Sequence, residues 1–334
     1  MIPKRIIRTA GIVCAASLLT AALGMPATAA STTKGVSVFF IGGKPTDPFW
    51  SIVKKGAEAA GKAVTAAGGS VTWLGPQNYD SLGADVAALI RQAIFSKAQA
   101  LVVPDWVPAA EDAQIKAAIK AHIPVVIVNA GGIEAAKATG ALTYVGTDEN
   151  LAGIAAGKYF GAHGVKRVLC VNTGPGNSNY ESRCAGVKAG IESKGGVMKT
   201  LWMDMSKFGD INAVKTQVQM KLKNNRDLDG VITMGADDAD SAAAAITSFG
   251  KIRKISLGSF DLTNKSVVNR IDAGMQLFAV DQQPYLQGYQ ATSIVWQYVQ
   301  CGIKPATSPL LTGPAIVDKS NVHQAKFGSS VGTR

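Results

Sequence analysis

Residues 100–128 read ALVVPDWVPAAEDAQIKAAIKAHIPVVIV, and this stretch sets the expected fold. It begins with the apolar run Ala100–Val103 and ends with the apolar run Pro124–Val128. Between the two runs the apolar residues recur at helical spacing. Continuous apolar strands have to be buried on both faces, so this strand–helix–strand order predicts a parallel sheet covered by helices.

The same alternation continues on both sides of this stretch, with an apolar run of strand length about every 25 to 35 residues. The other runs are Val36–Ile41, Val71–Leu74, Thr143–Val145, Arg167–Val171, Met198–Met203, Gly230–Met234, Ile255–Gly258 and Leu277–Val280. Ten strands exceed a usual single sheet, so the sequence predicts an α/β protein with two doubly wound lobes. Open α/β sheets bind ligands at the carboxyl ends of their strands, so function is expected in the strand-to-helix turns.

Helix-start signals agree with this pattern. Asp47-Pro48 places a capping carboxylate before a proline at the first helical position, and Gly68-Gly69 is expected to close that helix. Asp148 and Asp237 likewise precede Ala-rich stretches.

The first 30 residues have the three-part pattern of a secretory signal peptide. Lys4, Arg5 and Arg8 form a basic segment, Thr9–Leu23 is apolar, and Ala27-Thr28-Ala29 has the small residues that a signal peptidase accepts. The apolar run is shorter than the roughly 20 residues that cross a bilayer. We therefore expect the chain to be exported, with cleavage near Ala29 or Ala30.

Composition bounds the class of protein. Hydrophobic residues make up 47% of the chain and charged residues 17%, which is ordinary for a globular protein. The formal charge of +11 falls to +8 without the leader, because 31 Lys and Arg then face 23 acids. These cations are scattered along predicted helices rather than clustered with aromatic residues, so no nucleic-acid partner is expected.

Three cysteines follow the leader: Cys170, Cys184 and Cys301. Cys170 falls on a predicted strand and Cys184 on the next predicted helix, so a bridge between them is possible, but the sequence leaves this pairing open. The three histidines have no paired spacing with cysteine, so no metal site is expected.

The motifs of common α/β enzymes are missing. The turn Gly42–Asp47 lacks the GxGxxG pattern of dinucleotide binding, there is no phosphate-binding loop, and Gly258-Ser259-Phe260 does not make a GxSxG elbow. We therefore predict no catalytic residues and no cofactor.

The predicted turns instead combine aromatic rings with hydrogen-bonding side chains. The rings belong to Phe49, Trp50, Trp106 and Phe208, and the polar groups to Asp47, Asn129, Arg183, Asp261 and Gln282. A sugar or polyol has an apolar C–H face and a rim of hydroxyls, which suits such a set. A small polyhydroxy ligand is therefore expected.

Several segments resemble the periplasmic sugar-binding proteins of ABC importers, of the ribose-binding type. The segments are Asp47-Pro48-Phe49-Trp50, Ile123–Asn129, Tyr144–Glu149 with Ala152-Gly153, Arg183 with Gly186, Phe260-Asp261 and Asp281-Gln282-Gln283-Pro284. The likeness covers essentially the whole chain after the leader. It implies a type I periplasmic binding protein whose two lobes are joined by a three-strand hinge.

The resemblance implies ligand-binding roles for particular residues. Phe49 and Trp50 match aromatic residues that hold the sugar ring, and Asp47 stands where the family usually has Asn. Arg183 and Gln282 match the family's ligand arginine and hinge glutamine. Phe208 aligns loosely with an aromatic residue that closes over the sugar.

Other positions depart from the family or extend its site. Asn129-Ala130 replaces the common Asp-Arg, and Asp237 falls near another family Asn. Asp261 is expected to accept from two vicinal hydroxyls. Asp281 could add an acceptor or an ion pair with Arg183. Asp105 and Trp106 follow the third strand and complete the candidate set, either in the crevice or on the surface.

The expected lobes are residues 35–142 plus 283–304 and residues 147–280 plus 305–325, with 326–334 as a tail. By the resemblance, the ligand binds between the lobes by hinge closure and passes to an inner-membrane ABC permease. A monomer is expected, because a moving hinge is incompatible with a fixed interface across both lobes. The alternative is the same fold with a furanosyl quorum signal, a nucleoside or an amine-bearing polyol as ligand, which could be presented to a chemoreceptor.

Overall fold

The computed structural model describes residues 35–207, 209–249 and 254–334. The predicted signal peptide and Phe208 lie outside these residues. No helix in the described part of the chain is long and apolar enough to cross a membrane.

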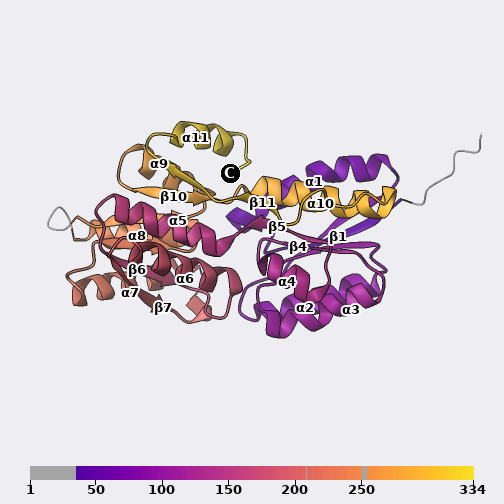
Figure 1. Ribbon diagram of the computed structural model, residues 1–334, viewed down its shortest axis with the longest axis horizontal. Helices are drawn as coiled ribbons and strands as arrows, with labels where there is room; N and C mark the ends of the chain where they lie inside the picture. The colour runs from indigo at the N-terminus through magenta and orange to yellow at the C-terminus, as the bar shows by residue number, and fades with distance from the viewer. Residues whose placement is uncertain (1–34, 208, 250–253) are drawn as a thin grey trace, which may run out of the picture. The chain divides into compact units, whose positions relative to one another are not determined.

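The first sheet, with the helices that cover it, is called lobe one (Figure 1). The order of its strands is β11-β5-β4-β3-β1-β2, and every pairing is parallel. The strands are β1 (Ser37–Ile41), β2 (Ser70–Leu74), β3 (Ala100–Val103), β4 (Val125–Val128), β5 (Thr143–Thr147) and β11 (Leu310–Gly313). The helices are α1 (Pro48–Ala66), α2 (Leu82–Phe95), α3 (Pro108–Lys120), α4 (Gly132–Thr139) and α10 (Pro284–Cys301).

The second sheet has the same plan and defines lobe two. Its order is β12-β10-β9-β8-β6-β7, with β12 antiparallel to β10 and the other pairings parallel. The strands are β6 (Arg167–Asn172), β7 (Val197–Trp202), β8 (Gly230–Thr233), β9 (Ser256–Phe260), β10 (Phe278–Asp281) and β12 (Ala315–Asp318). The helices are α5 (Glu149–Ala162), α6 (Ser178–Glu192), α7 (Ile211–Asn224), α8 (Ala236–Thr247), α9 (Lys265–Asp272) and α11 (Val322–Ser330).

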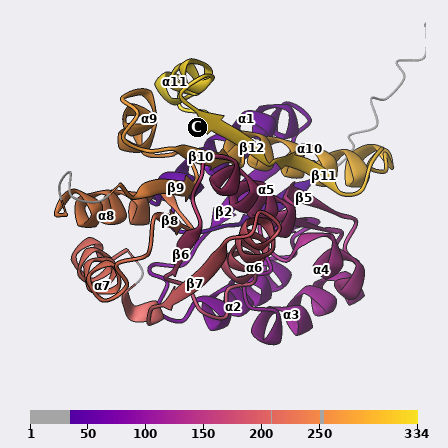
Figure 2. The same ribbon diagram turned by 60° about the vertical axis from the view of Figure 1, so that its left-hand side comes forward.

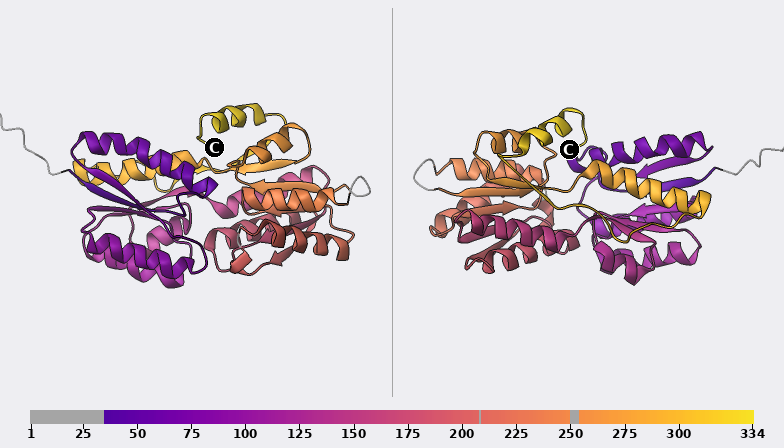
Figure 3. Two further views of the ribbon diagram at one scale, coloured as in Figure 1. Left: turned by 180° about the vertical axis from the view of Figure 1, so that it is seen from behind. Right: turned by 45° about the horizontal axis from the view of Figure 1, so that its top comes forward.

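The chain passes between the lobes three times. It leaves lobe one after β5, returns after β10, and crosses again between β11 and β12 (Figure 2). As a result α10 packs against α1, although more than 200 residues separate them (Figure 3). The predicted fold class, with two parallel-sheet lobes and a three-strand hinge, is confirmed.

All ten predicted strands are present within one or two residues of their expected ends. The sequence missed β11 and β12, because they are four-residue strands next to Pro309 and Pro314 in a polar segment. Since β11 pairs with β5, the predicted start of lobe two at residue 305 is too early. The predicted tail also begins too early, because α11 continues to Ser330.

The capping predictions have different outcomes. Asp47 caps α1 by accepting from the backbone N–H groups of Phe49 and Trp50, and Asp148 caps α5 by accepting from Leu151. Asp237 does not precede its helix: α8 begins one residue earlier, at Ala236, with Gly235 as its cap.

Candidate ligand-binding site

One pocket is lined by residues from both lobes, where the carboxyl ends of the two sets of strands meet. This is the position expected of a ligand site in open α/β sheets. The lining residues are Asp47, Phe49, Trp50, Tyr79, Leu82, Trp106, Asn129, Asn177, Asn179, Tyr180, Arg183, Asp261 and Gln282. Eight of the twelve predicted site residues are among them.

Lobe one contributes an aromatic wall. The ring of Trp50 lies 5.5 Å from that of Phe49 and 5.1 Å from that of Trp106, in edge-on contacts. Behind it, Trp73 lies 6.3 Å from Trp50. Trp50 and Trp106 are buried in the core of the lobe, whereas Phe49 is partly exposed. Edge-to-face packing is a favourable arrangement of aromatic rings, so the neighbouring rings restrict the orientation of Trp50.

The turn between β1 and α1 is shaped for this wall. A Cβ on Gly43 would lie 2.2 Å from a ring carbon of Trp50, so only glycine lets the backbone approach the indole this closely. The glycines in this turn therefore make room for the rings. This role does not require the GxGxxG spacing of a dinucleotide-binding turn, which the sequence lacks.

Asp47 connects the wall to the polar part of the pocket. Its Oδ1 accepts the two capping bonds of α1, and its Oδ2 accepts a 3.0 Å bond from the hydroxyl of Tyr79. Burial raises the pKa of Asp47, and the nearby carboxylate of Asp237 adds to this effect. Asp47 is thus both a cap and a pocket residue.

Lobe two contributes a buried charge network centred on Arg183, which is 1% exposed. Its Nε and Nη2 donate to the carboxylate of Glu149 at 2.7 and 2.8 Å, and Nη2 also donates to Oε1 of Gln282 at 2.7 Å. Nη1 donates to the carbonyl of Met234 at 2.7 Å. These bonds use four of the five N–H groups of the guanidinium, and the fifth, on Nη1, has no acceptor among the described residues.

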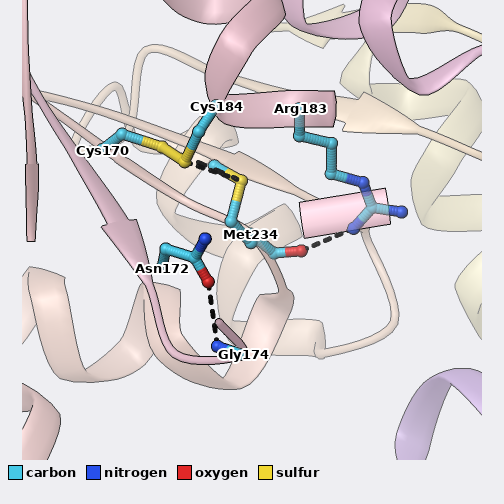
Figure 4. The surroundings of a disulfide bond; sticks show 6 residues. All are labelled: Cys170, Asn172, Gly174, Arg183, Cys184 and Met234. Atoms are coloured by element: carbon cyan, nitrogen blue, oxygen red, sulfur yellow. Dashed lines mark hydrogen bonds between the residues drawn. A yellow bond between two sulfur atoms is a disulfide. The ribbon is translucent and has the colours of Figure 1, made fainter. Parts of the chain in front are cut away.

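A disulfide joins Cys170 to Cys184, and Figure 4 shows it on one side of Met234 with the guanidinium of Arg183 on the other. The bond joins β6 to α6, and Cys184 follows Arg183 on the helix. Both sulfurs lie 3.8 to 3.9 Å from Sδ of Met234, whose carbonyl holds Arg183. The bridge that the sequence left open is therefore present, and it fixes both the helix that carries the arginine and one of its acceptors.

Close packing of α5 on α6 also fixes Arg183. A Cβ on Gly153 would lie 2.3 Å from the carbonyl oxygen of Arg183, and one on Gly186 would lie 2.2 Å from that of Asn150. Glycine at both places lets the two helices touch along their backbones, which brings Glu149 within reach of the guanidinium.

The residues that follow β4 and β9 occupy equivalent places in the two lobes. Asn129 and Asp261 both have left-handed backbones, with φ of 64° and 70°. The N–H of Asn129 donates to Val145 of β5, and that of Asp261 donates to Val280 of β10. Asn and Asp adopt this conformation more readily than other side chains except glycine, and such strain is concentrated at functional sites.

Asp261 lies beside the charge network. Its Oδ1 accepts from Nε2 of Gln282, and burial raises its pKa to about 7, although Arg183 opposes the shift. Asp261 is 7% exposed and lines the pocket, so its other oxygen is placed to accept from a ligand.

A second, adjoining pocket shares Asp47, Phe49, Tyr180 and Asp261 with the first. Asp237 and Asp238 line it as well. Asp237 accepts a 2.6 Å bond from Asn264, and Asp238 accepts a 2.7 Å bond from Thr173. Burial raises the pKa of Asp238 to about 6. Asp237 is thus beside the main pocket rather than in it.

Two of the predicted residues are turned away from both pockets. Asp105 is 1% exposed and lies under the Trp106 loop, in contact with Glu111. Asp281 pairs with Arg334 at 2.5 Å and accepts from the N–H of Gln283, so the expected ion pair with Arg183 is wrong. Asp105 follows β3 and Asp281 is the last residue of β10, but neither residue lines the two pockets.

The sequence analysis missed five lining residues: Tyr79, Leu82, Asn177, Asn179 and Tyr180. Asn177 is 6% exposed, and its Oδ1 has no hydrogen-bond partner among the described residues. The segment Asn177-Ser178-Asn179-Tyr180 follows the first strand of lobe two and joins amides to an aromatic ring. That combination was a usable signal, since the equivalent turn of lobe one holds Phe49 and Trp50.

Two doubly wound lobes around one shared pocket define the class as a two-lobed binding protein of type I. A family model described as a periplasmic binding protein domain matches residues 38–304, and the chain belongs to this family.

Solved structures and a curated relative agree with this assignment. A carbohydrate transporter from Acidothermus cellulolyticus 11B, in complex with myo-inositol, is 35% identical; the match has a TM-score of 0.80 and covers 90% of this chain and 100% of that one. A solute-binding protein from Burkholderia graminis C4D1M, in complex with D-arabinose, is 22% identical with a TM-score of 0.74, over 86% of this chain and 98% of that one. The xylose/arabinose-binding protein XylF of Sulfolobus acidocaldarius is 23% identical over 85% of this chain and 71% of its own length.

Proposed function

We propose that this protein binds a neutral sugar or polyol between its lobes in the periplasm and delivers it, unaltered, to an ABC permease. The observation that carries the proposal is one pocket with an aromatic wall from lobe one and hydrogen-bonding groups from lobe two. An aromatic face suits the C–H face of a sugar ring, and amide and carboxylate groups suit its hydroxyls. The myo-inositol complex of the 35% identical transporter supports a polyol.

In this proposal the lobes close around the ligand. Because the pocket takes residues from both lobes, a bound polyol contacts the two walls together only when they are close. Such a ligand stabilises the closed state by its differential affinity for it. Small-angle X-ray scattering should therefore show a smaller radius of gyration when ligand is added.

Isothermal titration calorimetry against a panel tests the binding itself. The panel contains myo-inositol, D-arabinose, D-xylose, D-glucose and D-galactose, with glucuronate and glucose 6-phosphate as anionic counterparts. We expect at least one neutral member to bind, and the anions to be rejected because carboxylates line both pockets. If none of the neutral compounds binds, the proposal is contradicted. Chemical turnover of any of them would contradict it as well.

Asn177→Ala tests whether this pocket is the site. Removing a buried amide that bonds a ligand leaves a ligand hydroxyl unpaired, which costs about 1 to 3 kcal/mol of binding. Asn269→Ala is a matched control, because Asn269 is exposed on α9 of the same lobe. Equal affinities of the two variants would place the ligand elsewhere.

The charges of the pocket favour one second candidate, an amine-bearing polyol. Among the described residues that line the two pockets, Arg183 is the one cation, and Glu149 already neutralises it. The carboxyl groups of Asp47, Asp237, Asp238 and Asp261 remain. A ligand ammonium group would offset their mutual repulsion. Adding glucosamine and an inosamine to the panel separates the amine-bearing polyol from the neutral polyol. Only the amine-bearing candidate predicts that the amine binds more tightly than its hydroxyl analogue.

A further inference from the structure

The loop between β3 and α3 joins the ligand pocket to the contact between the lobes. Trp106 of this loop belongs to the aromatic wall. Its carbonyl accepts a 2.9 Å bond from the N–H of Ser178 in lobe two. The hydroxyl of Ser178 donates a 2.8 Å bond to the carbonyl of Asp105. The position of one short loop thus sets both an aromatic face and two bonds between the lobes.

Two buried carboxyl groups support this loop from beneath. Asp105 is 1% exposed and Glu111 is fully buried. Oε2 of Glu111 accepts a 2.8 Å bond from the N–H of Trp106. Oδ1 of Asp105 and Oε1 of Glu111 are both buried without a donor among the described residues. Two carboxylates cannot satisfy one another, but a carboxylic acid can donate to a carboxylate.

The groups around the pair do not supply a compensating charge in direct contact. The two carboxyls interact with each other, the carboxyl of Asp112 of α3 lies within hydrogen-bonding reach of Asp105, and Lys116 of α3 acts on Asp105 through its charge. Lys116 is itself bonded to Asp112 at 2.9 Å, in a partly exposed pair. Contacts from other elements are made by Ala130 and Ser178, which are uncharged.

The electrostatics agree with a retained proton. Burial, together with the carboxylate of Asp105, raises the pKa of Glu111 to about 9. Burial, with a further contribution from Asp112, raises the pKa of Asp105 to about 7. Glu111 is therefore the group that carries the proton near neutral pH, and Asp105 is its acceptor.

We propose that Glu111 and Asp105 share one proton, and that this proton positions the Trp106 loop for ligand binding and for contact with Ser178. Glu111 is a positioning residue, because it acts through Trp106. Loss of the proton places two negative charges side by side in the core, and the loop has to move to hydrate them. Affinity for ligand and contact between the lobes should both weaken as the pH rises. The part of this inference that concerns affinity rests on the proposed function.

Glu111→Gln is the decisive variant. The amide of glutamine donates permanently to Asp105 and still accepts from the N–H of Trp106, so it copies the protonated acid at every pH. Glu134→Gln is the matched control, since Glu134 is exposed on the next helix of the same lobe.

Infrared difference spectroscopy tests the proton without any ligand. At pH 8 the wild type should show the C=O stretch of a protonated carboxylic acid that E111Q lacks and E134Q keeps. Identical acid bands in the wild type and E111Q would overturn the shared proton.

Hydrogen exchange and calorimetry then test the positioning role. Relative to E111Q, exchange at the Ser178 amide should accelerate in the wild type as the pH rises from 6 to 9. The dissociation constant for the tightest-binding polyol of the panel should rise up to about tenfold per pH unit in the wild type and E134Q, and less steeply in E111Q. Equal pH slopes in both measurements overturn the role. If no polyol binds, the proposed function fails, while the spectra and the exchange data still decide this inference.

Discussion

The two lobes share one plan and differ in how they build their half of the pocket. Their sheets have the same strand order, and Asn129 and Asp261 occupy the same turn with the same backbone bond to the next strand. Lobe one nevertheless presents packed rings, and lobe two a buried network of charged and amide groups. The topology places a site at the strand ends, and the packing behind each turn decides its chemistry.

The difference has an energetic consequence. A wall of rings is held by many small dispersion contacts, so one change removes only a part of it. A buried network depends on each member, because a charge that loses its partner stays in a medium of low polarity. Substitutions in lobe two should therefore affect stability more than comparable substitutions in the partly exposed part of the aromatic wall.

The largest effect is expected for Glu149→Ala in lobe two. Glu149 and Arg183 are both nearly fully buried, and the variant leaves the guanidinium without its carboxylate. Breaking a buried pair in this way costs about 3 to 5 kcal/mol of unfolding free energy. Urea denaturation of the ligand-free protein measures this loss of unfolding free energy.

The control for this variant is Glu192→Gln, which breaks the exposed pair between Lys188 and Glu192 of α6. Exposed pairs of this spacing contribute about 0.3 to 0.5 kcal/mol. If Glu149→Ala were no more destabilising than the control, the network would not hold lobe two together, and the contrast between the lobes would be lost.

The next effect concerns the disulfide that supports the network. Replacing Cys170 and Cys184 together by Ala opens a loop with a sequence separation of 14. Loss of a bridge of this span costs about 3 kcal/mol. Because α6 then has more freedom beside Arg183, ligand affinity should also fall, which calorimetry at a temperature well below unfolding would detect. Unchanged affinity in a destabilised variant would show that the bridge serves folding alone.

The sequence predicted where the site lies better than it predicted which residues line the site. Long Val/Ile runs such as Val125–Val128 revealed the strands, and parallel strands put the following residues at one edge. The spacing of residues along the chain does not say which way a side chain turns. For that reason the sequence left both Asp105 and Trp106 open between crevice and surface, whereas in the structure Trp106 lines the pocket and Asp105 is buried under the loop.

Residues that depend on contacts far apart in the chain could not be predicted in the same way. Tyr79 follows the edge strand β2, and at the pocket its hydroxyl donates to Asp47 and accepts from the N–H of Lys44. Asp281 is bound by Arg334, at the other end of a long segment that includes α10 and α11. The residues next to Tyr79 and Asp281 in the sequence do not indicate that Asp47 and Arg334 are their partners.

Stability depends on pH through different buried carboxyl groups in the two lobes: Asp105 and Glu111 in lobe one, and Asp238 and Asp261 in lobe two. Burial raises the pKa of Asp261 to about 7 and that of Asp238 to about 6, so folded lobe two retains protons that the unfolded chain releases. Stability then falls as the pH rises from about 4 through these values, by at most about 1.4 kcal/mol per pH unit for each proton. Asp261→Asn should reduce this slope between pH 5 and 7, measured as urea midpoints. An unchanged slope would mean that Asp261 is ionised throughout.

The smallest effect is expected at the exposed edge of the aromatic wall. Phe49→Leu keeps an apolar side chain of similar reach but removes the flat face and the edge contact with Trp50. Aromatic geometry of this kind is worth about 1 kcal/mol beyond the area that it buries, so the dissociation constant for a polyol should rise about fivefold. Unfolding should change little, because Phe49 is only partly buried. Phe95→Leu is the control, since Phe95 is 89% exposed on α2 of the same lobe and does not line the pocket. A loss of stability without a loss of affinity would reverse the assignment, because the ring would then support lobe one and not the ligand.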